Sequence, residues 1–154
     1  HFVYLYNFGA PWKTQYRARQ LMDRLYSPTP DGYPGEEDNG QMSAWYVFSA
    51  LGFYPLCPGS NQFVWGSPLF DEALLRFENG KTLIIKSTDN NSDNVFVKGL
   101  ELNGKPVARN WVANEELVNG GQIEFFMTAV PDKKRGTGPE SFPFSMTADS
   151  ANQK

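Results

Sequence analysis

Residues 41–51 are a stretch in which apolar side chains occupy almost every position. The flanking residues indicate a helix, because Gly52 can end it and Asp38 or Asn39 can cap its start. A helix without a polar face is normally buried on every side. The pattern therefore predicts a helix that other parts of a folded protein enclose.

The residues before this helix also favour helical structure. Residues 2–8 are rich in aromatic side chains and are predicted as the last turns of a helix. Pro11 opens a second helix, predicted over residues 12–26, whose apolar side chains recur at helical spacing while its Lys and Arg side chains fall largely on the other side. Gly and Pro at residues 27–35 predict a loop.

After residue 59 the pattern changes to short apolar runs, which are typical of β-strands. Glu78, Asn79 and Gly80 separate two of these runs and predict a hairpin turn. A single helical turn is expected at residues 114–118. The order of helices followed by strands predicts an α+β fold with a sandwich-like β-rich part. The expected strands cover residues 61–65, 73–77, 81–86, 95–97, 100–102, 110–112 and 122–127.

The same patterns divide the chain into three parts. Residues 1–59 form a helical part, residues 60–130 a β-rich segment, and residues 131–154 a tail rich in Gly, Pro, Ser and Lys. We expect this tail to be loose unless it docks on the rest of the protein. The sequence begins without Met, so we expect a piece of a longer protein, whose upstream helices pack against the helices here.

Composition narrows the classes of partner. The 154 residues carry a formal net charge of −3 and have a sequence pI near 5.1. An acidic chain is a poor partner for nucleic acid or for an anionic membrane surface. No apolar run reaches the roughly 18 residues of a membrane span.

Cysteine and histidine, the residues of many nucleophilic and zinc sites, each occur once. Cys57 follows an apolar run and has no histidine near it in sequence, so we interpret it as a buried structural thiol. A Ser-His-Asp triad or a histidine-rich zinc site would have to include His1, the first residue. Both classes of site are therefore disfavoured.

Three consecutive acids, Glu36, Glu37 and Asp38, stand between the Gly/Pro loop and the apolar helix. The N-terminus of a helix carries unpaired N–H groups and a partial positive charge, which favour ionised carboxylates. An ionised carboxylate suits a general base or a ligand of a hard metal ion, and does not suit a general acid. The alternative is that the acids only cap the helix, although one cap needs a single acid.

Two other polar stretches are interpreted as solvated loops. Residues 88–94 contain aspartate and asparagine side chains of the kind that bind calcium, but the spacing of an EF-hand and its closing Glu are absent. The basic run Lys133-Lys134-Arg135 lies in the Gly/Pro-rich tail.

Two long motifs resemble one family of enzymes. Residues 1–15 read HFVYLYNFGAPWKTQ, and residues 35–55 read GEEDNGQMSAWYVFSALGFYP, followed by Cys-Pro-Gly at 57–59. A weaker match is GSPLF at residues 66–70, with Leu-Asn-Gly-Lys at 102–105. Up to about residue 127 the chain resembles the C-terminal part of glycoside hydrolase family 92, the calcium-dependent exo-acting α-mannosidases.

The resemblance implies a fold and an activity. The helices would close an (α/α)6 toroid, and the strands would form the β-rich segment that ends the chain. The full-length protein would remove terminal α-linked mannose, expected to be α-1,2-linked, from glycans with inversion at the anomeric carbon. It would use Ca²⁺ to bind and distort the sugar, and it would be secreted, periplasmic or at the cell surface.

The resemblance also assigns roles in the acidic loop. Family members place the catalytic base in the loop that matches residues 35–39, so Asp38 is the expected base, Glu36 its partner and Glu37 the third candidate. The general acid would come from the upstream part of the polypeptide, so the 154-residue piece alone is expected to be inactive. The calcium ligands stay open, with Glu36, Glu37, Asp38 and Gln41 as candidates.

Substrate-binding residues are expected in both long motifs. Trp12, Lys13 and Gln41 would line the sugar site, and His1 matches a histidine of a family motif. A packing role for Trp12 is an equally open alternative.

A different class of function would be a non-catalytic carbohydrate-binding or scaffold module. Its support is the run of short strands together with Phe63, Trp65 and Trp111, whose rings could stack on sugars. Such a module needs aromatic platforms but no loop of three acids. A toroid hydrolase that acts on another sugar is opposed only by the length of the motif match. We therefore favour the mannosidase interpretation.

Overall fold

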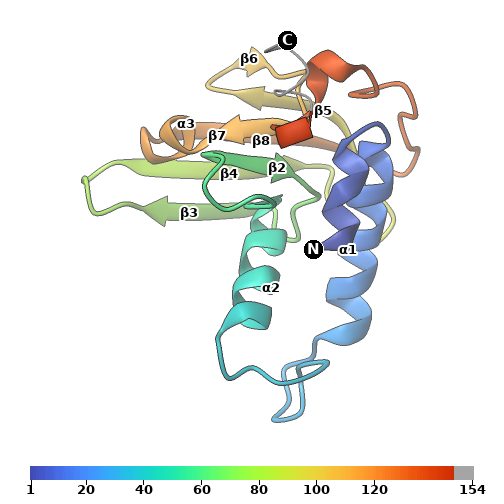
Figure 1. The fold of residues 1–154 in the computed structure, drawn as a ribbon, viewed down its shortest axis with the longest axis vertical. Helices are drawn as coiled ribbons and strands as arrows, with labels where there is room; N and C mark the ends of the chain where they lie inside the picture. Colours follow the sequence, from blue (N-terminus) through green and yellow to red (C-terminus); the bar gives the residue numbers. More distant parts are fainter. Residues whose placement is uncertain (148–154) are drawn as a thin grey trace.

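The structure, a computed structural model, describes residues 1–147, and its helices and strands separate into two regions (Figure 1). The long helices α1 (Pro11–Leu25) and α2 (Gln41–Leu51) extend from one side of the β-sheets, and the loop of residues 26–40 joins their far ends. The predicted α+β class is confirmed. The shorter helical segments are η1 (Phe2–Asn7), α3 (Asn114–Val118) and η2 (Pro139–Ser141).

The described strands form two sheets. One has three strands in the order β1-β2-β7, and the other has five in the order β3-β4-β8-β5-β6. Neighbouring strands in residues 1–147 are antiparallel except β4 and β8, which are parallel. The strands are β1 (Phe53–Tyr54), β2 (Gln62–Trp65), β3 (Glu72–Arg76), β4 (Thr82–Thr88), β5 (Phe96–Leu102), β6 (Lys105–Pro106), β7 (Trp111–Ala113) and β8 (Gly121–Thr128).

Turn residues set the ends of these elements as expected. Gly52 ends α2 with φ of +92°, a conformation that glycine adopts without a steric cost, and its N–H donates to the Ser49 carbonyl at 3.0 Å. The predicted hairpin between β3 and β4 is confirmed, with Gly80 at φ of +78°. Gly52 thus ends α2 immediately before the first strand, β1.

Strand pairing differs from the sequence prediction in the middle of the β-rich segment. The two short strands expected at 95–97 and 100–102 are one strand, β5, in which the register with β8 shifts between Val97 and Gly99. Such a bulge keeps both halves of β5 in the sheet. β7 does not continue that sheet, because it pairs with β2 in the smaller one.

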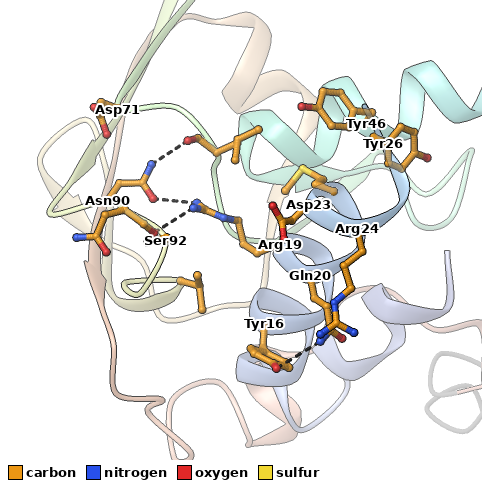
Figure 2. A pocket seen from close by; sticks show the side chains of 14 residues that line it. Tyr16, Arg19, Gln20, Asp23, Arg24, Tyr26, Tyr46, Asp71, Asn90 and Ser92 are labelled. Carbon is orange, nitrogen blue, oxygen red and sulfur yellow. Dashed lines mark hydrogen bonds between the residues drawn. The ribbon is translucent and has the colours of Figure 1, made fainter. Parts of the chain in front are cut away.

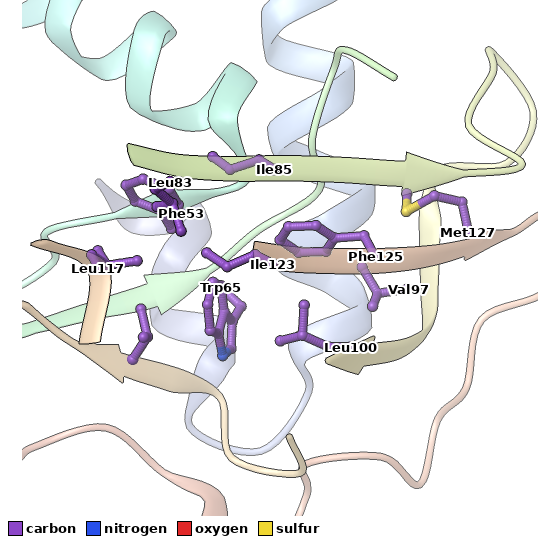
Figure 3. Close-up of a cluster of buried hydrophobic side chains, with 11 residues drawn as sticks. Phe53, Trp65, Leu83, Ile85, Val97, Leu100, Leu117, Ile123, Phe125 and Met127 are labelled. Atoms are coloured by element: carbon purple, nitrogen blue, oxygen red, sulfur yellow. The ribbon is translucent and has the colours of Figure 1, made fainter. Parts of the chain in front are cut away.

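The main hydrophobic core lies between the two sheets (Figure 3). Leu83 on β4 and Ile123 and Phe125 on β8 are fully buried, and they share this cluster with Trp65 on β2 and Val112 on β7. Along β8, buried residues alternate with partly exposed ones, as expected when one face of a strand covers a core. The β-rich part is therefore sandwich-like.

A second cluster joins the helices to the smaller sheet. Tyr4 of η1, Ala18 of α1 and Trp45 of α2 pack with Tyr54 and Val64 in this cluster. It fixes the direction in which both long helices leave the sheets.

Within residues 1–147, α2 is not enclosed on every side, and its burial against upstream helices stays a prediction. Trp45 is 6% exposed, but Val47 is 56% exposed. Gln41 and Ala44, which share the stripe of Val47 at three-residue spacing, are exposed as well, so this face of α2 is uncovered within residues 1–147.

The prediction of a buried thiol at Cys57 is wrong. The residue is exposed, in the segment between β1 and β2. Apolar neighbours in sequence did not bury it, since Pro58 and Gly59 beside it are exposed as well.

The described part of the predicted loose tail is docked on the sheets. Asn110 donates through Nδ2 to the Gly136 carbonyl at 2.7 Å, and the Phe144 N–H donates to Gln62 Oε1 at 2.7 Å. Residues 148–154 lie outside the described residues. The division at residue 60 stays a prediction, although β1 precedes it and pairs with β2 beyond it.

Candidate functional site

The acidic loop lies where α2 begins, at the end of the helix that is farthest from the sheets (Figure 1). Glu36 and Asp38 are exposed, and Glu37 is half-buried. The Gly40 N–H donates to the Glu37 carbonyl at 2.9 Å and closes a turn across Asp38. The three acids are therefore held on a bend immediately before a helix, as the sequence predicts.

Glu37 supplies the cap of α2. Its carboxylate accepts hydrogen bonds from the N–H groups of Met42 and Ser43, both at 3.0 Å, and from the Ser43 hydroxyl. The Ser43 hydroxyl bond is the largest cause that lowers the pKa of Glu37, and the two backbone N–H bonds add to it.

The predicted capping by Asp38 or Asn39 is wrong. The residue at the N-cap position is Gly40, which has no side chain, and the cap comes instead from Glu37. The glutamate side chain is longer than that of Asp or Asn, so it reaches across the turn to the first N–H groups of the helix that follows. Glu37 therefore caps the helix, which leaves Glu36 and Asp38 as the acids of this loop that are available for another role.

Glu36 and Asp38 have free carboxylates. Neither side chain makes a hydrogen bond or an ion pair within residues 1–147. Their oxygens can accept a proton from water or bind a cation, because no protein donor in this part of the chain occupies them.

His1 and Gln41 meet at the same end of α2. Gln41 Nε2 lies 2.5 Å from His1 Nε2, and the Tyr54 hydroxyl lies 3.2 Å from His1 Nε2 and 3.3 Å from His1 Nδ1. Both predicted residues thus lie beside the acidic loop, since Gln41 is the first residue of α2. The sequence prediction missed Tyr54, whose proximity to His1 depends on the return of the chain in β1.

Trp12 and Lys13 lie apart from this group. They are at the start of α1, whose 15 residues span about 22 Å before the chain enters the loop that carries the acids. Lys13 Nζ lies 5.4 Å from the ring centroids of Trp12 and of Tyr6, and Lys133 Nζ lies 5.4 Å from that of Trp12. Within this chain the two predicted sugar contacts form a separate cation–π cluster.

The donors in the acidic loop do not make a complete calcium site on their own. Calcium takes six to eight oxygen ligands. Both carboxylate oxygens of Glu37 are engaged by α2, which leaves Glu36 and Asp38. Within the described residues, no three or more His, Cys, Asp and Glu side chains form a group that could hold a metal ion.

A polar pocket of about 660 Å³ lies elsewhere, between α1 and the loop of residues 89–95 (Figure 2). Arg19 spans it and donates to the Pro68 carbonyl, to Asn90 Oδ1 at 2.9 Å and to the Asn91 carbonyl at 3.1 Å. Burial lowers the pKa of this guanidinium. None of the predicted site residues lines this pocket. The Arg19 contacts could not be predicted from local sequence, because they join α1 to residues about 50 to 70 positions away.

The aromatic residues that would support a binding module are not free platforms. Trp65 is 4% exposed, and Phe63 packs against the core between the sheets. The Arg109 guanidinium lies 4.5 Å from the centre of the Trp111 ring and covers it. The structure therefore removes the main support for a non-catalytic carbohydrate-binding module.

Comparison with known proteins identifies the class and then the family. The class is that of glycosyl hydrolase catalytic domains, since the model of the glycosyl hydrolase family 92 catalytic domain matches residues 1–129. The chain belongs to glycoside hydrolase family 92. None of the helices in residues 1–147 has the length and apolar character needed to cross a membrane.

Individual relatives agree with this family. An uncharacterized secreted glycosidase from Arthroderma benhamiae is 31% identical over 150 residues, which are 95% of this chain and 19% of the relative. A solved inverting mannosidase of family GH92 from Bacteroides thetaiotaomicron is 47% identical with a TM-score of 0.90, over 96% of this chain and 20% of that one. A GH92 α-mannosidase from the same organism, in complex with mannoimidazole, is 38% identical with a TM-score of 0.90, over 94% of this chain and 19% of that one. The chain thus spans about a fifth of the length of these relatives.

Proposed function

We propose that this chain is the C-terminal part of the catalytic domain of an inverting exo-α-mannosidase. The substrate would be terminal α-linked mannose in a glycan, and α-1,2 is the linkage we propose. Membership of family 92 and the likeness to solved mannosidases support the proposal. The observation that carries it concerns the acidic loop. Glu37 caps α2 through hydrogen bonds, while the carboxylates of Glu36 and Asp38 have no hydrogen-bond partner within residues 1–147.

An inverting glycosidase needs two carboxyl groups about 6.5–9.5 Å apart, with the sugar and one water between them. We assign Asp38 as the general base. It takes a proton from the water while the water oxygen forms a bond to the anomeric carbon and the glycosidic C–O bond breaks. A protonated acid on the other side of the sugar gives its proton to the leaving oxygen.

The general acid would come from the upstream part of the polypeptide. Glu36, Glu37 and Asp38 are consecutive on one bend, so they cannot face one another across a sugar ring. Glu36 would assist Asp38, and His1 and Gln41 would contact the sugar. For Trp12 and Lys13 we keep only the proposal that they line a more distant part of the glycan site, since α1 separates them from the acids.

Calcium and location complete the proposal. The proposal that the protein uses Ca²⁺ is based on the family resemblance. Glu36, Asp38 and Gln41 are the candidate ligands in this chain, and the remaining ligands would come from upstream, because the acidic loop offers too few donors. Secretion, or a place in the periplasm or at the cell surface, is supported by the relative described as secreted.

The test uses the full-length protein that contains this chain. Release of mannose from α-1,2-mannobiose is measured for the wild type and for Asp38→Asn, Glu36→Gln and Glu37→Gln. Asp38→Asn is expected to lower kcat by about 10²–10⁴-fold, the contribution of a general base, while substrate binding is kept. Glu37→Gln is the matched control, which should lower stability more than kcat.

Other outcomes would redirect or reject the assignment. A near-normal kcat in Asp38→Asn with a large loss in Glu36→Gln would move the base to Glu36. An inactive wild type, with or without calcium, would reject the mannosidase proposal.

A further inference from the structure

We propose that Tyr54 is a positioning residue, which holds the His1 imidazole beside the acidic loop and thereby sets how the ring meets the sugar. This inference deepens the proposed function and rests on it for the identity of the ligand. Tyr54 belongs to none of the sites assigned from the sequence, and its own side chain need not touch the substrate.

The geometry between the two rings supports a positioning contact. The Tyr54 hydroxyl oxygen is 3.2 Å from one nitrogen of the His1 imidazole and 3.3 Å from the other. The rings meet edge-on, with centroids 5.2 Å apart and planes at 85°. Because the hydroxyl lies within hydrogen-bond distance of both nitrogens, it can pair with the imidazole whichever nitrogen carries the proton.

Gln41 holds the ring from a second direction. Its amide nitrogen lies 2.5 Å from His1 Nε2, and Gln41 is the first residue of α2, next to the acidic loop. Two neighbours from different elements, β1 and α2, therefore define the ring position. Without Tyr54, Gln41 would remain as the one described side chain within hydrogen-bond distance of the imidazole.

Tyr54 is itself held by the core. It is 5% exposed, and its backbone pairs with Val64 in the smaller sheet. Its ring stacks on Tyr4, with centroids 4.8 Å apart and planes at 19°. Tyr4 is fully buried and donates from its hydroxyl to Ser49 Oγ at 2.7 Å. The hydroxyl that reaches His1 thus projects from a rigid stack, whereas His1 is exposed.

This arrangement has a consequence for binding. An exposed side chain that can adopt several rotamers must be ordered before it can contact a ligand, and this ordering weakens binding. A contact that keeps the imidazole in one orientation before the sugar arrives removes part of that cost. Loss of the Tyr54 hydroxyl should therefore weaken ground-state binding and leave the chemical step nearly unchanged.

The test compares two tyrosines of the same stack in the full-length protein. Tyr54→Phe removes the hydroxyl that faces His1 and keeps the ring, and Tyr4→Phe is the matched control because its hydroxyl faces Ser49. We expect Tyr54→Phe to raise KM for α-1,2-mannobiose, and Kd for mannoimidazole, by about twofold to tenfold, the range for one hydrogen bond. kcat should change by less than about threefold, and Tyr4→Phe should leave both constants unchanged.

A double-mutant cycle separates positioning from a general structural effect. If Tyr54 acts through His1, Tyr54→Phe has no further effect on KM in a His1→Ala background. Additive effects of the two changes would overturn the inference. A fall in kcat as large as the rise in KM, together with a lower Tm, would also overturn it, since this combination indicates a disturbed core.

A crystal structure of the full-length Tyr54→Phe variant tests the same inference without turnover. We expect the His1 ring to move or to occupy several orientations, while Tyr4→Phe leaves it in place. An unmoved His1 ring would overturn the positioning role even if the protein is an active mannosidase. An inactive wild type that does not bind mannoimidazole would reject the proposed function instead, and the ring position would still decide the role of Tyr54.

Discussion

Ser43 donates twice to the Glu37 carboxylate, once from its backbone N–H at 3.0 Å and once from its hydroxyl. The pair joins the middle of the acidic loop to the first turn of α2. The Glu37 carboxylate satisfies the N–H groups of Met42 and Ser43, which would otherwise need water, and it places a negative charge at the positive end of the helix. The free carboxylates on either side of Glu37 depend on this attachment for their position.

The first prediction concerns the pH dependence of this cap. The pKa of Glu37 is lowered in the folded chain, so its contribution to stability is present above the unfolded value near 4.3 and is lost as the pH falls through the folded pKa. Glu37→Gln should therefore lower Tm at pH 7. The difference from wild type should shrink steadily below about pH 4.3.

Ser43→Ala is the companion variant for this measurement. It removes the largest cause of the lowered pKa and keeps both backbone donors. It should shift the acid loss of stability to higher pH, toward the unfolded value. A Tm difference between Glu37→Gln and wild type that does not change between pH 7 and pH 3 would contradict the assigned cap.

The second prediction concerns two leucines of one hairpin. Leu83 on β4 is 0% exposed and lies between the sheets, whereas Leu74 on β3 is 51% exposed. Leu83→Ala should lower the free energy of unfolding by about 2–5 kcal/mol, because it leaves a cavity in a packed core. Leu74→Ala should change it by less than about 0.5 kcal/mol. Denaturant unfolding of both variants measures the difference, and similar losses would place the core elsewhere.

The bounds of α2 could be predicted closely because local residues set them. Gly52 and the acidic loop mark the two ends, and the structure begins the helix at Gln41 and ends it at Leu51 as expected. The hairpin at Glu78, Asn79 and Gly80 was predicted for the same reason, since an Asn-Gly turn is a local preference.

Features that depend on distant parts of the chain could not be predicted. β1 has only two residues and exists because β2 pairs with it, and β7 joins β2 across about fifty residues. The choice of Glu37 over Asp38 as the cap depends on the path of the bend, which residue types do not reveal. The proximity of Tyr54 to His1 likewise arises only in the folded chain.

The third prediction uses two glycines of left-handed conformation at the two ends of α2. Gly40 has φ of +65°, and a Cβ there would meet nothing within 4 Å. Gly52 has φ of +92°, and a Cβ there would lie 3.0 Å from Phe125 Cζ and 3.2 Å from Pro68 Cβ. Gly40→Ala should cost roughly 1–2 kcal/mol from the backbone alone. Gly52→Ala should cost more, because it adds an overpacked contact of about 1–3 kcal/mol.

The measurement for both glycine variants is the free energy of unfolding in urea. Phe125 is fully buried, so it has little room to move away from a new methyl group at residue 52. Equal costs at the two positions would show that Pro68 and Phe125 adjust freely, against the packing described for the core.

The fourth prediction separates calcium binding by this chain from the calcium use that we propose for the full-length protein. A chelator should lower the mannosidase activity of the full-length protein, and added Ca²⁺ should restore it. The Tm of this chain alone should not change with Ca²⁺, because no group of three or more candidate side chains holds a metal within residues 1–147. A clear calcium-dependent rise in Tm of the chain would show that residues 36–41 bind the ion without upstream ligands.

The position of β8 bears on how this part of the protein is made. β8 (Gly121–Thr128) is inserted between β4 and β5 at the centre of the larger sheet. During vectorial synthesis the β3–β4 and β5–β6 hairpins leave the ribosome first, and each presents an unpaired edge until β8 follows. A nascent chain stopped before residue 121 would expose both edges and the apolar residues that β8 covers, which favours aggregation or recognition by chaperones. The larger sheet is therefore complete only after β8, the last strand in residues 1–147, has been synthesised.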